Sequence, residues 1–217
     1  GGVAGGMSAA TRLRRLDESA EILVLEKSGF VSYANCGLPY YIGGVITNEA
    51  ALLLQTPESL HNRFNLAVKV NTEVISIDRK NKMVTTKIGE AIKFDKLILS
   101  PGAKPIQLPI PGIELAQTLR TVEDVKRINE MISNIQGNAV VIGGGFIGVE
   151  MAENLVHRGI KTTLLEALPQ VLAPLDVEMA SFVHQEIVKN GVDLRLNVKI
   201  KGIFADHILL ESGEKIP

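Results

Sequence analysis

Short apolar runs separated by polar and glycine-rich turns divide the chain into strands and helices. Residues 22–25, 139–142 and 161–165 have the length and composition of buried strands. Residues 121–135 and 176–189 fit helices that begin at a Thr or Asp and continue with helix-forming side chains. This succession of strands and helices predicts an α/β fold.

The middle of the chain has the pattern of short strands joined by tight turns. Residues 68–70, 73–78 and 83–88 alternate or run apolar between Asn and Lys turns, as the strands of a meander do. Residues 96–99 have the pattern of a buried strand that stops at Ser100, Pro101 and Gly102. A proline-rich crossing follows, and we expect the domain boundary just past it, giving domains 1–115 and 116–217. Further strands are expected at residues 192–196, 200–204 and 208–211.

Composition narrows the classes of function. The 217 residues include 23 basic and 24 acidic side chains, so no strong field would draw the chain to nucleic acid or an anionic membrane. No apolar run reaches the roughly 18 residues that a membrane span needs. A single cysteine excludes an internal disulfide framework and a Cys-rich zinc site. The four histidines are not grouped, so no metal site is predicted.

Both ends of the sequence indicate a fragment of a longer protein. Residues 1–6 form a glycine turn of the kind that normally follows a buried strand. The chain ends at Pro217, where a hairpin would be returning to a sheet. We therefore expect a fold without its first strand and its C-terminal part.

One sequence device occurs twice: a glycine turn, then a helix, a strand and an acid. In the second copy Gly143, Gly145 and Gly148 follow an apolar run, and Glu166 ends the next one. The first glycine makes a tight turn, the second lets backbone N–H groups approach a pyrophosphate, and the third lets helix pack on strand. The acid then accepts a hydrogen bond from a ribose hydroxyl. This copy predicts a dinucleotide site, the alternative being a turn that serves only helix–sheet packing.

The first copy is less complete. Gly1 and Gly6 keep the outer positions, Val3 replaces the middle glycine, and Glu26 is the acid. In the second copy, Glu166 would repel a 2′-phosphate, which favours NADH over NADPH. The alternative for Glu166 is a solvated strand end, and Lys161 nearby would soften the preference.

The lone thiol, Cys36, follows closely after the first acid. Pro39 indicates that a helix begins around Cys36. Backbone donors and the positive end of the helix dipole favour a thiolate, so this position would make a nucleophile. The alternative is that Cys36 is a small buried hydrophobe.

Several separated motifs resemble one family. The stretch Ser-Tyr-Ala-Asn-Cys-Gly-Leu-Pro-Tyr at residues 32–40, the paired glycine turns and Leu-Ser-Pro-Gly-Ala at residues 99–103 are similar to the single-cysteine branch of the FAD-dependent pyridine nucleotide-disulfide oxidoreductases, of the coenzyme A disulfide reductase type. The resemblance implies two Rossmann-like domains, with FAD in the first and a nicotinamide nucleotide in the second. It also implies that Cys36 is the redox-active cysteine, with Asn35 and Ser32 as neighbours in substrate binding.

The resemblance implies further contacts, which fall into three groups. Those for FAD are Gly1, Gly2, Val3, Ala4, Gly5, Gly6, Glu26, Lys27, Val74, Ser100, Pro101, Gly102 and Arg120. Those for the nicotinamide nucleotide are Gly143, Gly145, Phe146, Ile147, Gly148, Glu150 and Glu166. Those for coenzyme A are Ser8, Arg12, Arg15 and the less closely matched Arg63. Without the resemblance, Arg12 and Arg15 would be interpreted as a solvated helix face. Phe146 would be interpreted as a core side chain and Glu150 as an exposed charge on a helix.

The implied activity is reduction of coenzyme A disulfide, a persulfide or a polysulfide, with a mixed disulfide between Cys36 and bound coenzyme A. Relatives that reduce peroxide or oxygen have a histidine in the first glycine turn where this chain has Ala4. Two alternatives stay open: an NADH oxidase or peroxidase of the same family, and a flavin- or nucleotide-binding protein without thiol chemistry. A small-molecule disulfide partner, a homodimer of the full-length protein and a cytoplasmic location are expected.

Overall fold

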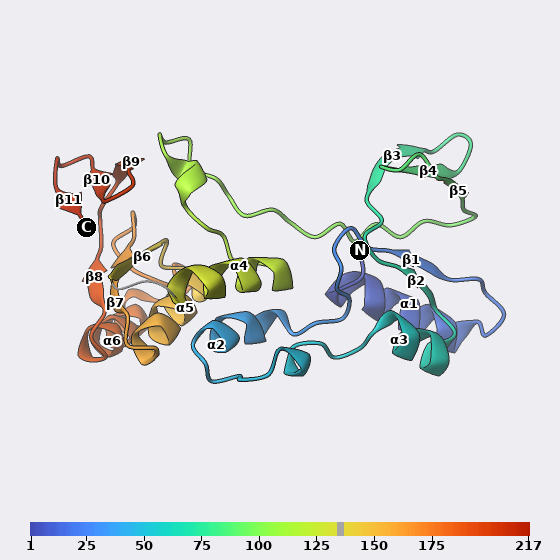
Figure 1. The fold of residues 1–217 in the computed structure, drawn as a ribbon, viewed down its shortest axis with the longest axis horizontal. Coiled ribbons are helices and arrows are strands. Elements are labelled where there is room, and N and C mark those ends of the chain that lie inside the picture. Colours follow the sequence, from blue (N-terminus) through green and yellow to red (C-terminus); the bar gives the residue numbers. More distant parts are fainter. Residues whose placement is uncertain (134–136) are drawn as a thin grey trace. The chain divides into compact units, whose positions relative to one another are not determined.

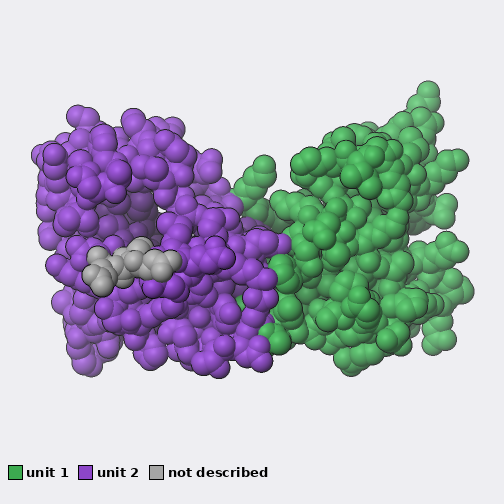
Figure 2. All heavy atoms as spheres, viewed as in Figure 1, with its two compact units in different colours: residues 1–34, 50–104 green, residues 35–49, 105–217 purple. Residues whose placement is uncertain are grey.

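The computed structural model describes residues 1–133 and 137–217, which form two compact units (Figure 2). Unit 1 contains residues 1–34 and 50–104, and unit 2 contains residues 35–49 and 105–217. The contacts therefore group residues 35–49 and 105–115 with unit 2, whereas the sequence pattern assigned them to the first domain. The boundary after residue 115 stays a prediction for the two cofactor domains.

Unit 1 is built on a pair of parallel strands. Strand β1 (Leu23–Leu25) pairs with β2 (Ala67–Lys69), so that Val24 lies opposite Val68. Helices α1 (Ala4–Leu16) and α3 (Pro57–Phe64) pack against these strands (Figure 1). The capping box of Thr56 and Ser59 starts α3, and Asn65 ends it in the left-handed conformation.

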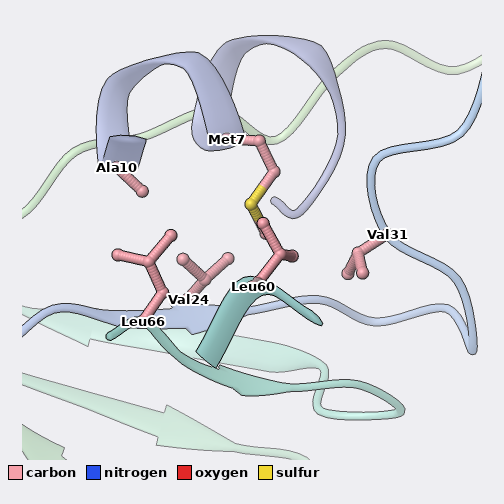
Figure 3. Packing of buried hydrophobic residues seen from close by; sticks show 6 residues of the cluster. All are labelled: Met7, Ala10, Val24, Val31, Leu60 and Leu66. Carbon is pink, nitrogen blue, oxygen red and sulfur yellow. The ribbon is translucent and has the colours of Figure 1, made fainter. Parts of the chain in front are cut away.

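The apolar core of unit 1 lies between these helices and strands. Figure 3 shows Met7 and Ala10 of α1 directed toward side chains from β1 and α3. Met7, Ala10 and Arg14 form the buried face of α1, since residues three and four apart share a helix face. The buried cluster consists of Met7, Ala10, Val24, Val31, Leu60 and Leu66.

A separate antiparallel meander completes unit 1. Its strands are β3 (Val74–Asp78), β4 (Met83–Thr86) and β5 (Ala91–Lys93). The prediction that residues 68–70 belong to the meander is wrong, because this run pairs in parallel with β1. The pairing continues past both strands, as Thr72 N donates to Glu26 O at 2.8 Å and Asn71 N donates to Ser28 O at 2.9 Å.

The strand expected at residues 96–99 is not formed. Leu97, Ile98 and Leu99 are 40%, 59% and 65% exposed, and no strand of the described residues pairs with them. An apolar run becomes a strand only where a neighbour supplies ladder hydrogen bonds. The apolar pattern therefore predicted a strand that these residues do not form in the structure.

Unit 2 has a parallel sheet with the order β6, β7, β8. The strands are β6 (Asn138–Ile142), β7 (Lys161–Leu165) and β8 (Asp193–Arg195), and β7 lies in the middle. Helix α5 (Phe146–His157) connects β6 to β7, and α6 (Val177–Lys189) connects β7 to β8. Ala152, Leu164, Val171, Ile187 and Val192 form the buried cluster of these elements.

The remaining elements of unit 2 precede or follow this sheet in the sequence. Strands β9 (Ile200–Ile203), β10 (Ile208–Leu210) and β11 (Lys215–Ile216) form a second, antiparallel sheet. Helix α4 (Val122–Ser133) precedes β6, and residues 134 and 135 of the predicted helix lie outside the described residues. The short helices are η1 (Asn35–Gly37), α2 (Leu38–Ile42) and η3 (Ile113–Leu115), while η2 (Glu49–Ala51) lies where the chain enters unit 1 again.

The α/β fold and the two glycine turns that each lead into a helix are confirmed. Helix α6 and strands β6, β7, β9 and β10 agree with the predicted ranges to within a residue or two. The first helix begins earlier than its helix-forming side chains suggest. Helix α1 already starts at Ala4, inside the glycine turn.

Candidate functional site

The glycine turn of unit 2 joins β6 to α5 and leaves open space in front of the helix. Gly143 has a φ of 100°, a conformation that favours glycine. A Cβ atom at Gly148 would collide with the carbonyl oxygen of Gly143, so helix and turn are packed backbone to backbone. A Cβ atom at Gly145 would meet no atom within 4 Å. The middle position therefore leaves the room that an approaching pyrophosphate needs.

The glycine turn of unit 1 repeats two parts of this arrangement, the close backbone contact and the N-cap position. A Cβ atom at Gly6 would collide with the carbonyl oxygen of Gly1, as one at Gly148 would with that of Gly143. Val3, the N-cap residue of α1, takes the place of Gly145, the N-cap residue of α5. Neither helix has an acidic residue in its first turn or a side-chain cap. Both N-termini therefore suit an anionic group.

The predicted acids lie beside these turns and contact their backbones. Glu26 Oε2 accepts a hydrogen bond from Gly2 N at 2.6 Å, and its Oε1 accepts one from Ser28 N at 2.8 Å. Glu166 Oε2 accepts from Gly144 N at 2.6 Å, and its Oε1 accepts from Leu168 N at 2.8 Å. Glu26 is buried and Glu166 is half-buried. The sequence predicted the acids but not that the turn itself would be their partner.

The second residue of each turn is held from its other side as well. Gly2 O accepts from Ser32 N at 2.8 Å, and Gly144 O accepts from Leu172 N at 2.8 Å. Ser32 and Leu172 are both left-handed, with φ of 46° and 49°. Each of them lies six positions after its acid in the sequence.

Other residues expected at FAD differ in how closely they approach the turn of unit 1. Ser100 lies against it, since a Cβ atom at Gly5 would be 3.3 Å from Ser100 Oγ. Pro101 and Gly102 are exposed. Lys27 lines a small hollow together with Asn71, Thr72, Glu73, Thr86, Lys87 and Ile88. Val74 is half-buried and does not line this hollow.

Cys36 lies in η1, two residues before the first residue of α2. The thiol is exposed, so it is not packed as a small buried hydrophobe. Asn35 is also exposed, and its Nδ2 donates to Arg120 O at 3.5 Å. Ser32 belongs to unit 1 and these two residues belong to unit 2.

Helix α2, which follows the thiol, is fixed on α5 within unit 2. Gly43 packs so closely on Asn154 that a Cβ atom there would be 2.8 Å from Asn154 Cβ. Arg158 Nη1 donates to Ile42 O at 2.8 Å, and His157 Nδ1 lies 3.3 Å from Gly43 O. These residues are not among the predicted site residues. The one signal in the sequence is Asn154, a polar residue on the apolar side of α5, which the structure shows to be only 1% exposed.

Acidic groups of α5 act on the tyrosine one turn beyond the thiol. The carboxylates of Glu153 and Glu150, burial and the Cys36 sulfur together raise the pKa of Tyr40 above its usual value, with Glu153 contributing most. Tyr40 is therefore a neutral phenol at physiological pH. Glu150 is half-buried, whereas Phe146 and Ile147 at the start of α5 are 61% and 53% exposed.

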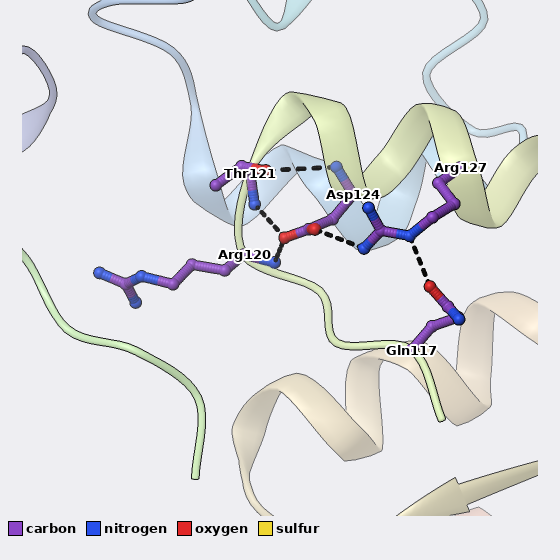
Figure 4. A network of polar contacts seen from close by, with 5 residues as sticks. All are labelled: Gln117, Arg120, Thr121, Asp124 and Arg127. Carbon is purple, nitrogen blue, oxygen red and sulfur yellow. Dashed lines mark hydrogen bonds and ion pairs between the residues drawn. The ribbon is translucent and has the colours of Figure 1, made fainter. Parts of the chain in front are cut away.

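Arg120 stands at the entrance to α4. Its backbone N and that of Thr121 each donate to Asp124 Oδ2 at 3.0 Å, and Asp124 also binds Arg127 Nη2 at 2.7 Å (Figure 4). Figure 4 shows the Arg120 side chain pointing away from this network. Its backbone is thus fixed while its guanidinium extends away from the helix start.

The residues expected to contact coenzyme A lie on one exposed face of α1. Ser8, Arg12 and Arg15 are exposed and follow the i, i+4, i+7 spacing of a helix face. Arg14 points the other way and donates to the carbonyl oxygens of Phe64, Asn65, Asp17 and Glu18. Arg63 is exposed, with its guanidinium 5.3 Å from the centre of the Phe64 ring.

The described residues, 1–133 and 137–217, lack the features of two other kinds of site. No helix in these ranges has the length and apolar character to cross a bilayer. The same ranges contain no group of three or more His, Cys, Asp or Glu side chains able to hold a metal ion.

Comparison with known proteins identifies the family of the chain. The model of the family described as "Pyridine nucleotide-disulphide oxidoreductase" matches residues 1–217. A coenzyme A disulfide reductase of Staphylococcus aureus (strain JH9) is 36% identical over 220 residues, which cover 99% of this chain and 50% of that protein. The chain thus spans about half the length of the curated relatives it matches.

Solved structures agree with the sequence comparison. The crystal structure of reduced Bacillus anthracis CoADR-RHD has a TM-score of 0.95 and 48% identity, covering 100% of this chain and 41% of that one. An NAD-dependent persulfide reductase from A. fulgidus also has a TM-score of 0.95, with 33% identity, covering 100% of this chain and 43% of that one. The chain belongs to the pyridine nucleotide-disulphide oxidoreductase family.

Proposed function

We propose that the protein containing this chain is an FAD-dependent NADH oxidoreductase that reduces coenzyme A disulfide, or a related persulfide or polysulfide, through Cys36. The observation that carries the proposal is the exposed position of the chain's single thiol, at a short helix fixed on α5. The names of similar proteins, a coenzyme A disulfide reductase and a persulfide reductase, support the substrate class.

The two glycine turns are the proposed nucleotide sites. Residues of the unit 1 turn, with Glu26, Lys27, Val74, Ser100, Pro101, Gly102 and Arg120, would hold FAD. Residues of the unit 2 turn, with Phe146, Ile147, Glu150 and Glu166, would hold the nicotinamide nucleotide. The bare N-termini of α1 and α5 and the open space at Gly145 fit pyrophosphate groups. Each acid retains acceptor sites for ribose hydroxyls, and the charge of Glu166 favours NADH over NADPH.

Cys36 would perform the thiol chemistry. When bound, FAD would supply the electron pair, taken from reduced nicotinamide, that cleaves the disulfide between Cys36 and coenzyme A. Cleavage leaves the Cys36 thiolate and free coenzyme A thiolate. The Cys36 thiolate then attacks a new disulfide, forms one mixed disulfide and releases the other half as thiolate. Asn35 and Ser32 would orient the substrate sulfur, and Ser8, Arg12, Arg15 and Arg63 would bind phosphate groups of coenzyme A.

Two measurements on the full-length protein test the thiol role. The mass of the oxidised protein should fall by one coenzyme A on reduction, and Cys36→Ser should prevent this change. Cys36→Ser should also abolish NADH-dependent disulfide reduction while the flavin absorbance is kept. Ser59→Ala, which alters a hydroxyl at the start of α3, is the control and should keep both the adduct and turnover.

Other results would favour other functions. Unchanged disulfide turnover in Cys36→Ser would indicate a flavoprotein without thiol chemistry. Peroxide turnover as efficient as disulfide turnover would indicate a peroxidase. We further propose a homodimer of the full-length protein and a cytoplasmic location, where a reducing environment keeps the thiol product reduced.

A further inference from the structure

We propose that Glu26 and Glu166 are positioning residues that hold each glycine turn in its nucleotide-binding shape through the backbone of the second turn residue. The inference deepens the proposed function and rests on it, because it gives these acids a task besides accepting ribose hydroxyls. We call the contacts of Gly2 with Glu26 and Ser32, and of Gly144 with Glu166 and Leu172, the two turn clamps.

The turn clamps are the same in two segments of different sequence. In each, the acid binds the N–H of the second turn residue at 2.6 Å. In each, a left-handed residue donates to the carbonyl oxygen of that turn residue at 2.8 Å. The glycine and the acid are the same in both turns. The left-handed residues differ, since one is Ser32 and the other is Leu172. The repetition indicates that both turns require an acid at the N–H and a backbone donor at the carbonyl oxygen, whichever side chain the left-handed residue carries.

Close packing against a valine restricts the second turn residue from a third side. A Cβ atom at Gly2 would lie 2.6 Å from Val31 Cγ1, and one at Gly144 would lie 2.7 Å from Val171 Cγ1. Both valines are buried. The second turn residue is therefore bound at its N–H, bound at its carbonyl and packed on its Cα, so the peptide planes on both sides of it are fixed. Those planes lead directly into the helix N-terminus that would meet the pyrophosphate.

The carboxylates can hold the turn and a ribose at the same time. A carboxylate offers about four acceptor positions, two on each oxygen. Glu166 uses one on Oε2 for Gly144 N and one on Oε1 for Leu168 N. One position on each oxygen is left for a ribose hydroxyl.

The turn clamps also explain how unit 1 tolerates Val3 at the middle position. The side chain at this position takes no part in the contacts of the second residue, since Gly2 and Gly144 interact through their own N–H and C=O groups. The shape of the turn is kept by the clamp even where the middle glycine is missing.

The test uses the full-length protein and variants Glu166→Ala and Glu166→Gln, with Glu211→Ala as the control for loss of an exposed carboxylate in unit 2. The first readout is amide hydrogen exchange at Gly144 without nicotinamide nucleotide. The second is equilibrium binding of NADH and of an NADH analogue whose adenosine ribose lacks both hydroxyls. Thermal unfolding checks that each variant is folded.

A turn clamp predicts that Glu166→Ala speeds exchange at Gly144 and weakens both ligands, each by about tenfold or more, since a charge-assisted bond is lost. Glu166→Gln, which keeps one acceptor oxygen, should have a smaller effect, and Glu211→Ala none. Unchanged exchange at Gly144 in Glu166→Ala, or unchanged binding of the analogue, overturns the clamp. Failure of the wild-type protein to bind NADH would instead count against the proposed function, while the exchange result still decides the clamp.

Discussion

Arg14 shows how one charged residue can organise the backbone of unit 1. It is 9% exposed and donates to four backbone carbonyl oxygens, two in the loop after α1 and two at the end of α3. Arg12 and Arg15, its neighbours on the helix, are exposed and are proposed to bind substrate phosphates. The same residue type thus has a structural role on one face of α1 and a proposed binding role on the other.

This difference predicts unequal losses of stability for two neighbouring substitutions. Arg14→Met should lower the free energy of unfolding by about 3 kcal/mol, because buried carbonyl groups lose charge-assisted partners. Arg15→Met should change it by less than about 0.5 kcal/mol, as an exposed residue does. Denaturant unfolding of the full-length protein measures both. Equal effects of the two substitutions would contradict the structural role of Arg14.

At the scale of elements, the attachment of α2 to α5 determines where Cys36 lies within unit 2. A Cβ atom at Gly43 would overlap Asn154, whose side chain is 1% exposed and donates to Glu150 O at 2.8 Å. Asn154 therefore has no room to move aside. Any side chain at Gly43 must push α2, which directly follows the η1 segment with Cys36, away from α5.

Gly43→Ala should consequently cost about 2 kcal/mol of stability, as overpacking of a tight contact does. It should also reduce disulfide turnover, because the η1 segment that contains Cys36 leads directly into α2. Gly44→Asn is a suitable control, since Gly44 has a φ of 78° with open space around it and Asn tolerates this conformation. Thermal unfolding and steady-state kinetics test both variants. Normal activity and stability in Gly43→Ala would show that the contact can relax.

Elements with strong apolar periodicity could be predicted from the sequence, and their pairing could not. Helix α6 was expected at residues 176–189 and is observed at Val177–Lys189. The prediction is accurate because the period of a helix involves only residues close together in the sequence. Residues 68–70 were placed in the wrong sheet because alternation says nothing about the direction of pairing. Residues 96–99 lack a partner strand among the described residues.

The candidate site was foreseen in part for a similar reason. The spacing of Gly143, Gly145, Gly148 and Glu166 predicted a glycine turn with an acid beside it, and the structure shows this arrangement. The bonds to Ile42 O and Gly43 O could not be predicted, because every residue has a carbonyl oxygen and no sequence pattern marks the ones that are used.

At the scale of the whole chain, the two glycine turns divide the proposed cofactors between the units. Each turn lies within one unit and has its own acid, its own left-handed residue and its own buried valine. The chemical difference between the turns is small, so assignment of FAD to unit 1 and NADH to unit 2 is a separate proposal that needs its own test.

Addition of NADH to the full-length flavoprotein should slow amide hydrogen exchange at residues 143–148 more than at residues 1–6. The physical reason is that pyrophosphate oxygens accept from backbone N–H groups at the N-terminus of α5. Exchange measured by mass spectrometry with and without NADH provides the comparison, and free nicotinamide, which lacks the pyrophosphate, is the control. Protection confined to residues 1–6 would reverse the assignment.

The bare N-termini of α1 and α5 have a practical consequence. Helices α3, α4 and α6 each begin with acidic residues that neutralise their dipoles, and these two do not. Sulfate or inorganic phosphate at high concentration would find the same exposed donors as a nucleotide. Buffers and crystallisation salts of this kind should therefore act as competitors, and apparent affinities for dinucleotides should depend on which anion accompanies the protein.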